Sequence, residues 1–275
     1  LATMPGASAV PRGETVLLAR GKAALMPIIV SEKAGEREKK AAATLADYLS
    51  RISGATFAEK TGDGVAGIVL GRPAQFTKLP VKVQFPTGPY DREDYLLHSS
   101  KTGLWLLGAT ELAVEHAVWD TLHRLGYRQF FPGKTWEVIP TQETLTLAVE
   151  AREHPSYTHR RIWYNWGNLD YNTETYREWC QRNRMAQGFM LNSGHSYGAM
   201  IRENKAEFDA HPEYYALLNG KREVNGESKM CLSNPDLRKV LVAWAVRSMK
   251  ANPTADSISV DPSDGGGWCE CEECA

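Results

Sequence analysis

The sequence has almost no net charge, no long apolar run and no phosphate-binding loop. Its 32 Lys and Arg residues against 33 Asp and Glu residues leave a formal net charge of -1, so the composition offers no electrostatic attraction for nucleic acid or an anionic membrane. No stretch approaches the roughly 20 apolar residues that span a bilayer. The P-loop pattern is missing, and no G-x-G-x-x-G stands between a strand-like run and a helix-like one. We therefore expect no nucleic-acid partner and no membrane-spanning segment, and a neutral or sugar-like partner fits better.

Cysteine is scarce and unevenly placed. Of the five cysteines, Cys180 and Cys231 stand alone, whereas Cys269, Cys271 and Cys274 form a C-x-C-x-x-C run. Because the count is odd, a monomer with every cysteine in a disulfide is impossible. Two interpretations remain open. Together with Cys231, the run supplies four thiolates, enough for a structural zinc ion; alternatively, the cysteines form disulfides in an oxidising compartment and Cys180 stays free.

The residues that are abundant are typical of a folded, soluble protein rich in aromatic rings. The chain is 43% hydrophobic and 24% charged, and it contains 8 Trp and 11 Tyr. Aromatic residues fill cores around a pocket, and their flat faces also stack on sugar rings. With 275 residues, the chain has room for two ordinary domains or for one large barrel.

Residues 1–150 alternate short apolar runs with amphipathic segments. In residues 36–53, apolar side chains recur at helical spacing before Gly54, and a second helix is expected from an N-cap at Thr110 to Gly126. The predicted strands are 15–19, 26–30, 67–71, a hairpin of 94–98 with 103–108, and finally 127–132, 136–139 and 145–149, which finish the sheet. This pattern predicts a small α/β domain.

A change of composition at residues 151–156 predicts a domain boundary, after which strand, loop and helix repeat. The predicted strands are 161–166, 189–191, 230–232 and 257–260, with helices at 172–187, capped by Asn172, and at 235–250, capped by Ser233 or Asn234. Such units favour a (β/α)8 barrel of the TIM type, of which residues 151–275 hold the first half, although an open doubly wound sheet gives the same local pattern. We expect the remaining barrel half or a partner chain to cover the fourth strand.

Active sites of such barrels lie in the loops that follow the strands. The carboxylates in these loops are Asp261 and Asp264, and glycoside hydrolysis commonly uses two carboxylates. Asp261 could equally stabilise a turn, whereas Asp264 precedes three glycines that allow a ligand to approach the backbone. Further candidates for holding a substrate are Arg161, Trp166, His195, Tyr197 and Asn234, although Asn234 also suits a helix cap.

Several segments resemble known families. Residues 122–136 (LHRLGYRQFFPGKTW) resemble the small α/β domain that precedes the barrel in α-glucuronidases and β-hexosaminidase-type glycoside hydrolases. Residues 211–222 (HPEYYALLNGKR), 231–235 (CLSNP) and 260–274 (VDPSDGGGWCECEEC) resemble a bacterial domain family of unknown function that commonly follows it. The resemblance implies a bacterial, secreted or periplasmic protein, its signal peptide removed, that acts on carbohydrates through a barrel domain.

One departure from these families limits which sugar is expected. Hexosaminidase-type enzymes place an adjacent Asp-Glu pair after the fourth strand, where this chain has Asp264 and Gly265. Substrate-assisted cleavage of an N-acetyl sugar is therefore not expected. The resemblance implies instead a glycoside hydrolase-like protein for polysaccharides or oligosaccharides, uronic-acid-containing ones included, that needs no cofactor. The alternative is a non-catalytic carbohydrate-binding protein on the same fold.

Overall fold

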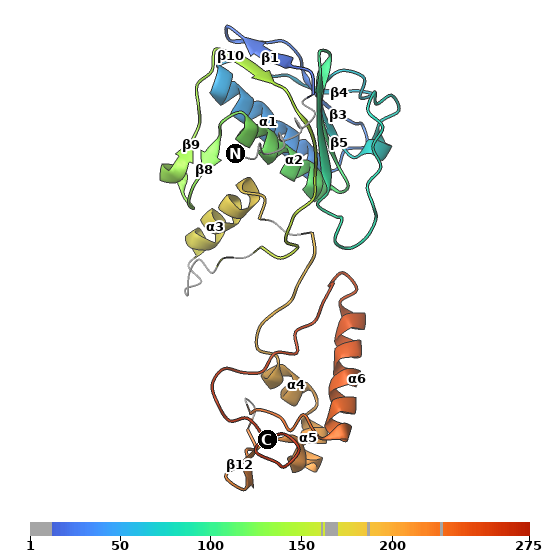
Figure 1. Ribbon diagram of the computed structural model, residues 1–275, viewed down its shortest axis with the longest axis vertical. Helices are drawn as coiled ribbons and strands as arrows, with labels where there is room; N and C mark the ends of the chain where they lie inside the picture. The colour runs from blue at the N-terminus through green and yellow to red at the C-terminus, as the bar shows by residue number, and fades with distance from the viewer. Residues whose placement is uncertain (1–12, 161, 163–169, 186–187, 226–227) are drawn as a thin grey trace, which may run out of the picture. The chain divides into compact units, whose positions relative to one another are not determined.

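The computed structural model describes residues 13–160, 162, 170–185, 188–225 and 228–275 (Figure 1). The chain divides into two compact units, Leu1–Phe189 and Met190–Ala275. In the described part of the chain, no helix combines the length and the apolar character needed to cross a membrane.

The first unit is built on a six-stranded mixed sheet. Its strands lie in the order β11 (Glu150–Glu153), β6 (Tyr95–Ser100), β7 (Gly103–Gly108), β5 (Gly67–Gly71), β3 (Ile28–Val30) and β4 (Glu59–Thr61). The strands from β7 to β4 run parallel, whereas β6 and β11 are antiparallel to their neighbours. Every residue of β5 and β7 is buried, as expected for strands covered on both faces.

Two helices, α1 (Glu36–Ser53) and α2 (Glu111–Arg124), pack against each other on one face of this sheet (Figure 1). Both follow the sequence prediction. The α1 helix ends at Gly54, whose φ of 72° is the left-handed conformation that favours glycine. The Thr110 hydroxyl accepts a hydrogen bond of 3.2 Å from the Ala113 N–H and so caps α2. The opposite face of the sheet is covered by apolar residues between Phe76 and Phe85, which follow the short 3-10 helix η1 (Pro73–Gln75).

The strands predicted to finish the sheet lie elsewhere. Strand β10 (Thr144–Leu147) pairs with β1 (Val16–Arg20), which also pairs with β2 (Ala23–Ala24), in a separate three-stranded sheet. A hairpin of β8 (Arg128–Gln129) and β9 (Glu137–Val138) flanks the 3-10 helix η2 (Lys134–Trp136). One edge of the large sheet is β11, which lies where the sequence predicted a domain boundary.

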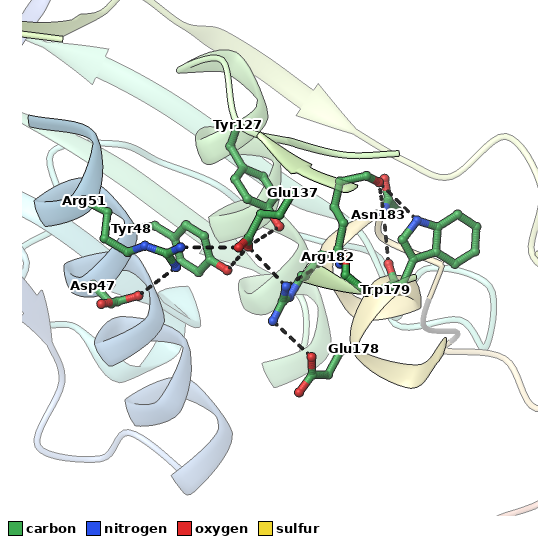
Figure 2. A network of polar contacts seen from close by, with 11 residues as sticks. Asp47, Tyr48, Arg51, Tyr127, Glu137, Glu178, Trp179, Arg182 and Asn183 are labelled. Carbon is green, nitrogen blue, oxygen red and sulfur yellow. Dashed lines mark hydrogen bonds and ion pairs between the residues drawn. The ribbon is translucent and has the colours of Figure 1, made fainter. Parts of the chain in front are cut away.

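The first unit also includes α3 (Asp170–Arg182), beyond the predicted boundary at residue 150. Figure 2 shows the network that holds α3, centred on the Glu137 carboxylate. Glu137 accepts hydrogen bonds from the hydroxyls of Tyr48 (2.5 Å) and Tyr127 (3.1 Å) and forms an ion pair of 3.2 Å with Arg182 of α3. Because these contacts tie α3 to the hairpin and to α1, the helix belongs with the first unit. Asn172 lies inside α3 and is not its N-cap.

In its described residues, the second unit combines the helices α4 (Tyr197–Glu203), α5 (Lys205–Ala210) and α6 (Pro235–Ala251) with a 3-10 helix η3 (Pro212–Tyr214) and a hairpin of β12 (Leu217–Leu218) and β13 (Lys221–Arg222). Asn219 and Gly220 turn the hairpin with φ of 49° and 74°. The core of the unit is formed by Tyr197, Met200, Ile201, Phe208, Tyr214, Tyr215, Met230, Leu237 and Trp244.

The predicted half barrel is not confirmed. Most of the predicted strand 161–166 lies outside the described residues. Among the described residues of the second unit, the only ladder between named strands is β12 with β13. Residues 190–192 hydrogen-bond directly to residues 256–257, so the segment 230–232 does not lie between the predicted second and fourth strands. Met230 instead forms an isolated antiparallel bridge with Tyr215. What is shown is a mixed α/β chain.

Candidate functional site

Two segments of the second unit, residues 190–195 and 256–261, run side by side in the same direction. The Met190 N–H donates to Asp256 Oδ2 at 2.8 Å, and the Asn192 N–H donates to Ser257 Oγ at 2.7 Å. At the far end, His195 and Asp261 form a parallel bridge. The carboxyl ends of neighbouring parallel segments meet at one edge, so the loops that follow them also meet there.

His195 and Asp264, both predicted as site residues, are in contact at this edge. His195 Nε2 lies 3.2 Å from Asp264 Oδ2, and His195 Nδ1 lies 2.6 Å from the carbonyl oxygen of Pro262. With an acceptor at each ring nitrogen, the doubly protonated ring is favoured, and the Pro262 carbonyl and the Asp264 carboxylate raise the pKa of His195 above its usual 6.5. The side chains are 54% and 95% exposed, so both can meet a ligand.

Asp261, the second predicted carboxylate, has a local partner. Its Oδ2 accepts a hydrogen bond of 2.9 Å from the Gly194 N–H, and its backbone carbonyl accepts one of 3.0 Å from the Ser196 N–H. The Gly194 N–H lowers the pKa of Asp261, because it stabilises the ionised form. Asp261 is therefore a fixed anion that joins the two segments.

Lys229 is a residue of the site that the sequence did not indicate. It is 4% exposed, and its ammonium donates to the carbonyl oxygens of Ser263 and, at 3.3 Å, Asp264. The same ammonium lies 4.8 Å from the ring centroid of Trp268, which is 56% exposed. Lys229 thus holds the loop that carries Asp264 and Trp268. No sequence signal links Lys229 to that loop, whereas Trp268 stands directly before Cys269 and could have been noticed.

The other predicted substrate-holding residues lie away from this edge or outside the described residues. Tyr197 is 4% exposed and belongs to the core of the second unit. Asn234 caps α6, because its Oδ1 accepts from the N–H groups of Asp236 at 2.9 Å and Leu237 at 3.1 Å. Arg161 and Trp166 lie outside the described residues.

A cluster of four thiols lies in the same unit, formed by Cys231, Cys269, Cys271 and Cys274. Their sulfur atoms all lie within 4.8 Å of one another, a grouping that could hold a metal ion. The nearby Ser233 hydroxyl lowers the pKa of Cys271 to about 6, whereas burial raises that of Cys269 to about 11. The fifth cysteine, Cys180, lies in α3 of the first unit, where burial raises the pKa of its thiol.

Solved structures of glycoside hydrolases are similar to part of the chain. A GH20 β-N-acetylhexosaminidase from Streptomyces coelicolor A3(2) is 24% identical over 56% of this chain and 26% of its own, with a TM-score of 0.38. The family GH115 4-O-methyl-α-glucuronidase BtGH115A, with specificity for decorated arabinogalactans, is 16% identical over 65% of this chain and 25% of its own, with a TM-score of 0.43. The chain thus spans about a quarter of the length of these enzymes.

Two further comparisons concern the sequence. No curated protein matches the chain. Residues 131–275, more than half of the chain, match a family model described as a domain of unknown function (DUF4838), and they include all of the second unit with its site and its thiol cluster. The chain belongs to the DUF4838 family.

Proposed function

We propose that the protein is a glycoside hydrolase-like protein that cleaves glycosidic bonds of oligosaccharides or polysaccharides, uronic-acid-containing ones included. The observation that carries the proposal is the contact of 3.2 Å between His195 and Asp264, on the loop whose Trp268 ring is exposed. The Lys229 ammonium contacts both the Asp264 carbonyl and the Trp268 ring, so Asp264 and Trp268 belong to one surface. A carboxylate, a cation and an aromatic face suit a charged sugar.

The proposed chemistry needs only acid and base groups. The Asp264 carboxylate takes a proton from the water that attacks the anomeric carbon. As the glycosidic bond breaks, the leaving oxygen takes a proton from the imidazolium of His195, whose charge also attracts a uronate carboxylate. Asp261 supplies the second negative charge, fixed by the Gly194 N–H. Trp268 stacks on a sugar ring. No metal takes part in these steps.

The alternative is a carbohydrate-binding protein without turnover. A glycosidase acid usually lies in a partly dry pocket that keeps it protonated, whereas the Asp264 side chain is 95% exposed. This exposure favours binding of a carbohydrate, without cleavage, through the side chains of His195, Asp264 and Trp268.

Release of reducing sugar from a panel of neutral and uronic oligosaccharides, together with calorimetric binding, distinguishes the two functions. Hydrolysis predicts turnover by the parent and a loss of about 100-fold or more in Asp264→Asn with binding retained. The matched control is Asp209→Asn, an exposed Asp paired with Lys205 on α5, which should leave turnover unchanged. Binding without turnover in the parent would establish the alternative, and neither binding nor turnover would refute both.

A further inference from the structure

We propose that Cys231, Cys269, Cys271 and Cys274 together bind one zinc ion. In a tetrahedral site with zinc–sulfur bonds of about 2.3 Å, the sulfur atoms lie about 3.8 Å apart. Here the Sγ atoms of Cys231 and Cys271 lie 3.6 Å apart, and all four lie within 4.8 Å of one another. A disulfide would bring two sulfurs to about 2.05 Å and would leave the other two without a reason to converge.

The turn between Cys271 and Cys274 has the form that a metal site needs. The Cys274 N–H and the Ala275 N–H both donate to the carbonyl oxygen of Cys271, at 2.9 and 3.0 Å. This turn brings two thiols of one C-x-x-C segment to one point. The other two ligands lie outside this turn. Cys269 stands just before it, and Cys231 comes from a segment nearly forty residues earlier in the sequence.

Hydrogen-bond donors around the cluster suit thiolates. A zinc ion with four thiolates carries a net charge of −2, which nearby donors and cations must balance. The Leu217 N–H donates to Cys269 Sγ at 3.3 Å, and the Arg222 guanidinium lies 4.0 Å from the same sulfur. The Ser233 hydroxyl lies 3.3 Å from Cys231 Sγ and 3.4 Å from Cys271 Sγ. A disulfide is neutral and would not need these donors and this cation to balance a negative charge.

The site is closed, which points to a structural role. Four protein ligands leave no open position for a substrate or water at a tetrahedral ion. Cys231 and Cys269 are 4% and 7% exposed, so the ion would lie at the edge of the small apolar cluster around Ala216. Cys231 follows Lys229 by two residues, and Cys269 follows Trp268 directly. The ion would therefore anchor the segment of Lys229, which holds the Asp264 loop, and it would also anchor the end of that loop at Trp268.

The test is metal analysis of the purified protein, with thiol titration after denaturation in chelator without reductant. We expect one zinc ion per chain and five titratable thiols. The Cys271→Ser variant should retain less than about a tenth of the zinc, whereas Cys180→Ser, which changes the cysteine outside the cluster, should retain all of it. Iron in place of zinc, or two disulfides with a single thiol, would overturn the proposal.

A second measurement needs no variant and so does not depend on how a variant folds. Exchange of the wild-type protein into Co²⁺ should give the visible absorption of a tetrahedral thiolate complex. Chelation of the zinc should lower the Tm of the wild-type protein by at least about 5 °C, because the ion stabilises only the folded chain. No cobalt spectrum and an unchanged Tm would refute a zinc site, whether or not the protein acts on carbohydrates.

Discussion

The ammonium of Lys229 lies 4.8 Å from the centroid of the Trp268 ring, and the two residues differ sharply in exposure: Lys229 is 4% exposed and Trp268 56%. A buried cation beneath one face of an indole fixes the orientation of the ring and leaves other parts of its surface to solvent. An aromatic ring held in this way is prepared for stacking without a large loss of side-chain entropy on binding.

The first prediction concerns this ring. Trp268→Ala should weaken oligosaccharide binding about tenfold, because a stacked sugar loses its aromatic partner. Calorimetric titration with the best ligand of the oligosaccharide panel measures the effect. Trp136→Ala, which removes a similarly exposed tryptophan of the first unit, should leave the affinity unchanged. Equal affinity of the parent and Trp268→Ala would show that Trp268 does not contact the bound oligosaccharide.

The second prediction concerns Lys229 itself. Lys229→Met keeps an unbranched side chain that is one atom shorter and removes the donor to the carbonyl oxygens of Ser263 and Asp264. We expect the free energy of unfolding to fall by about 2 kcal/mol, because these carbonyls lose a buried charged donor. Denaturant titration gives the value. In Lys239→Met, which removes an exposed lysine paired with Asp236, the change should stay within about 0.5 kcal/mol.

How far the sequence predicts this molecule depends on how local each feature is. The bounds of α1 follow from helical periodicity and a terminal glycine, and α6 follows from its Asn234 cap and Pro235, all signals within one segment. Strand β11 escaped detection because it is an edge strand rich in charge, Glu-Ala-Arg-Glu, and resembles a linker. Its pairing with β6 is visible only in three dimensions.

The site shows the same division. The loops after apolar runs indicated His195, Asp261 and Asp264 as candidates, because the ends of such runs are local signals. The structure brings the three residues to one edge, and their role in a site stays a prediction. The contact between residues 190–195 and 256–261 was not predicted, because the order of strands in a sheet is set by packing between distant segments. Lys229 was missed for that reason, since its partners lie more than thirty residues away.

The third prediction concerns the charge of His195. Its pKa is raised by the Pro262 carbonyl and the Asp264 carboxylate. The imidazolium contact is therefore complete below pH 6.5 and is lost as the pH rises through the higher folded pKa. NMR titration of the ring protons should give a lower pKa for His195 in Asp264→Asn than in the parent, and the parent value in Asp209→Asn. An identical pKa in all three proteins would mean that the His195–Asp264 contact is absent in solution.

The last prediction concerns the network of Figure 2, where Glu137 joins α1, the β8–β9 hairpin and α3. Burial raises the pKa of Glu137, but hydrogen bonds from Tyr48 and Tyr127 and the charge of Arg182 outweigh it, so the pKa lies below 4.5. A lowered folded pKa contributes stability that is present above about pH 4.5 and is lost as the pH falls through the folded value.

Glu137→Gln should therefore lower the free energy of unfolding by about 2 kcal/mol at neutral pH, because Arg182 and the two tyrosines lose a charged acceptor. The loss should shrink as the pH falls below 4.5, since the parent then loses the same charge. The matched control is Glu178→Gln, which removes only an exposed partner of Arg182 and should change the free energy by at most about 0.5 kcal/mol. Denaturant titrations between neutral pH and about pH 3 measure both variants. A loss independent of pH would show that the Glu137 side chain stabilises the unit through packing, and that its charge does not.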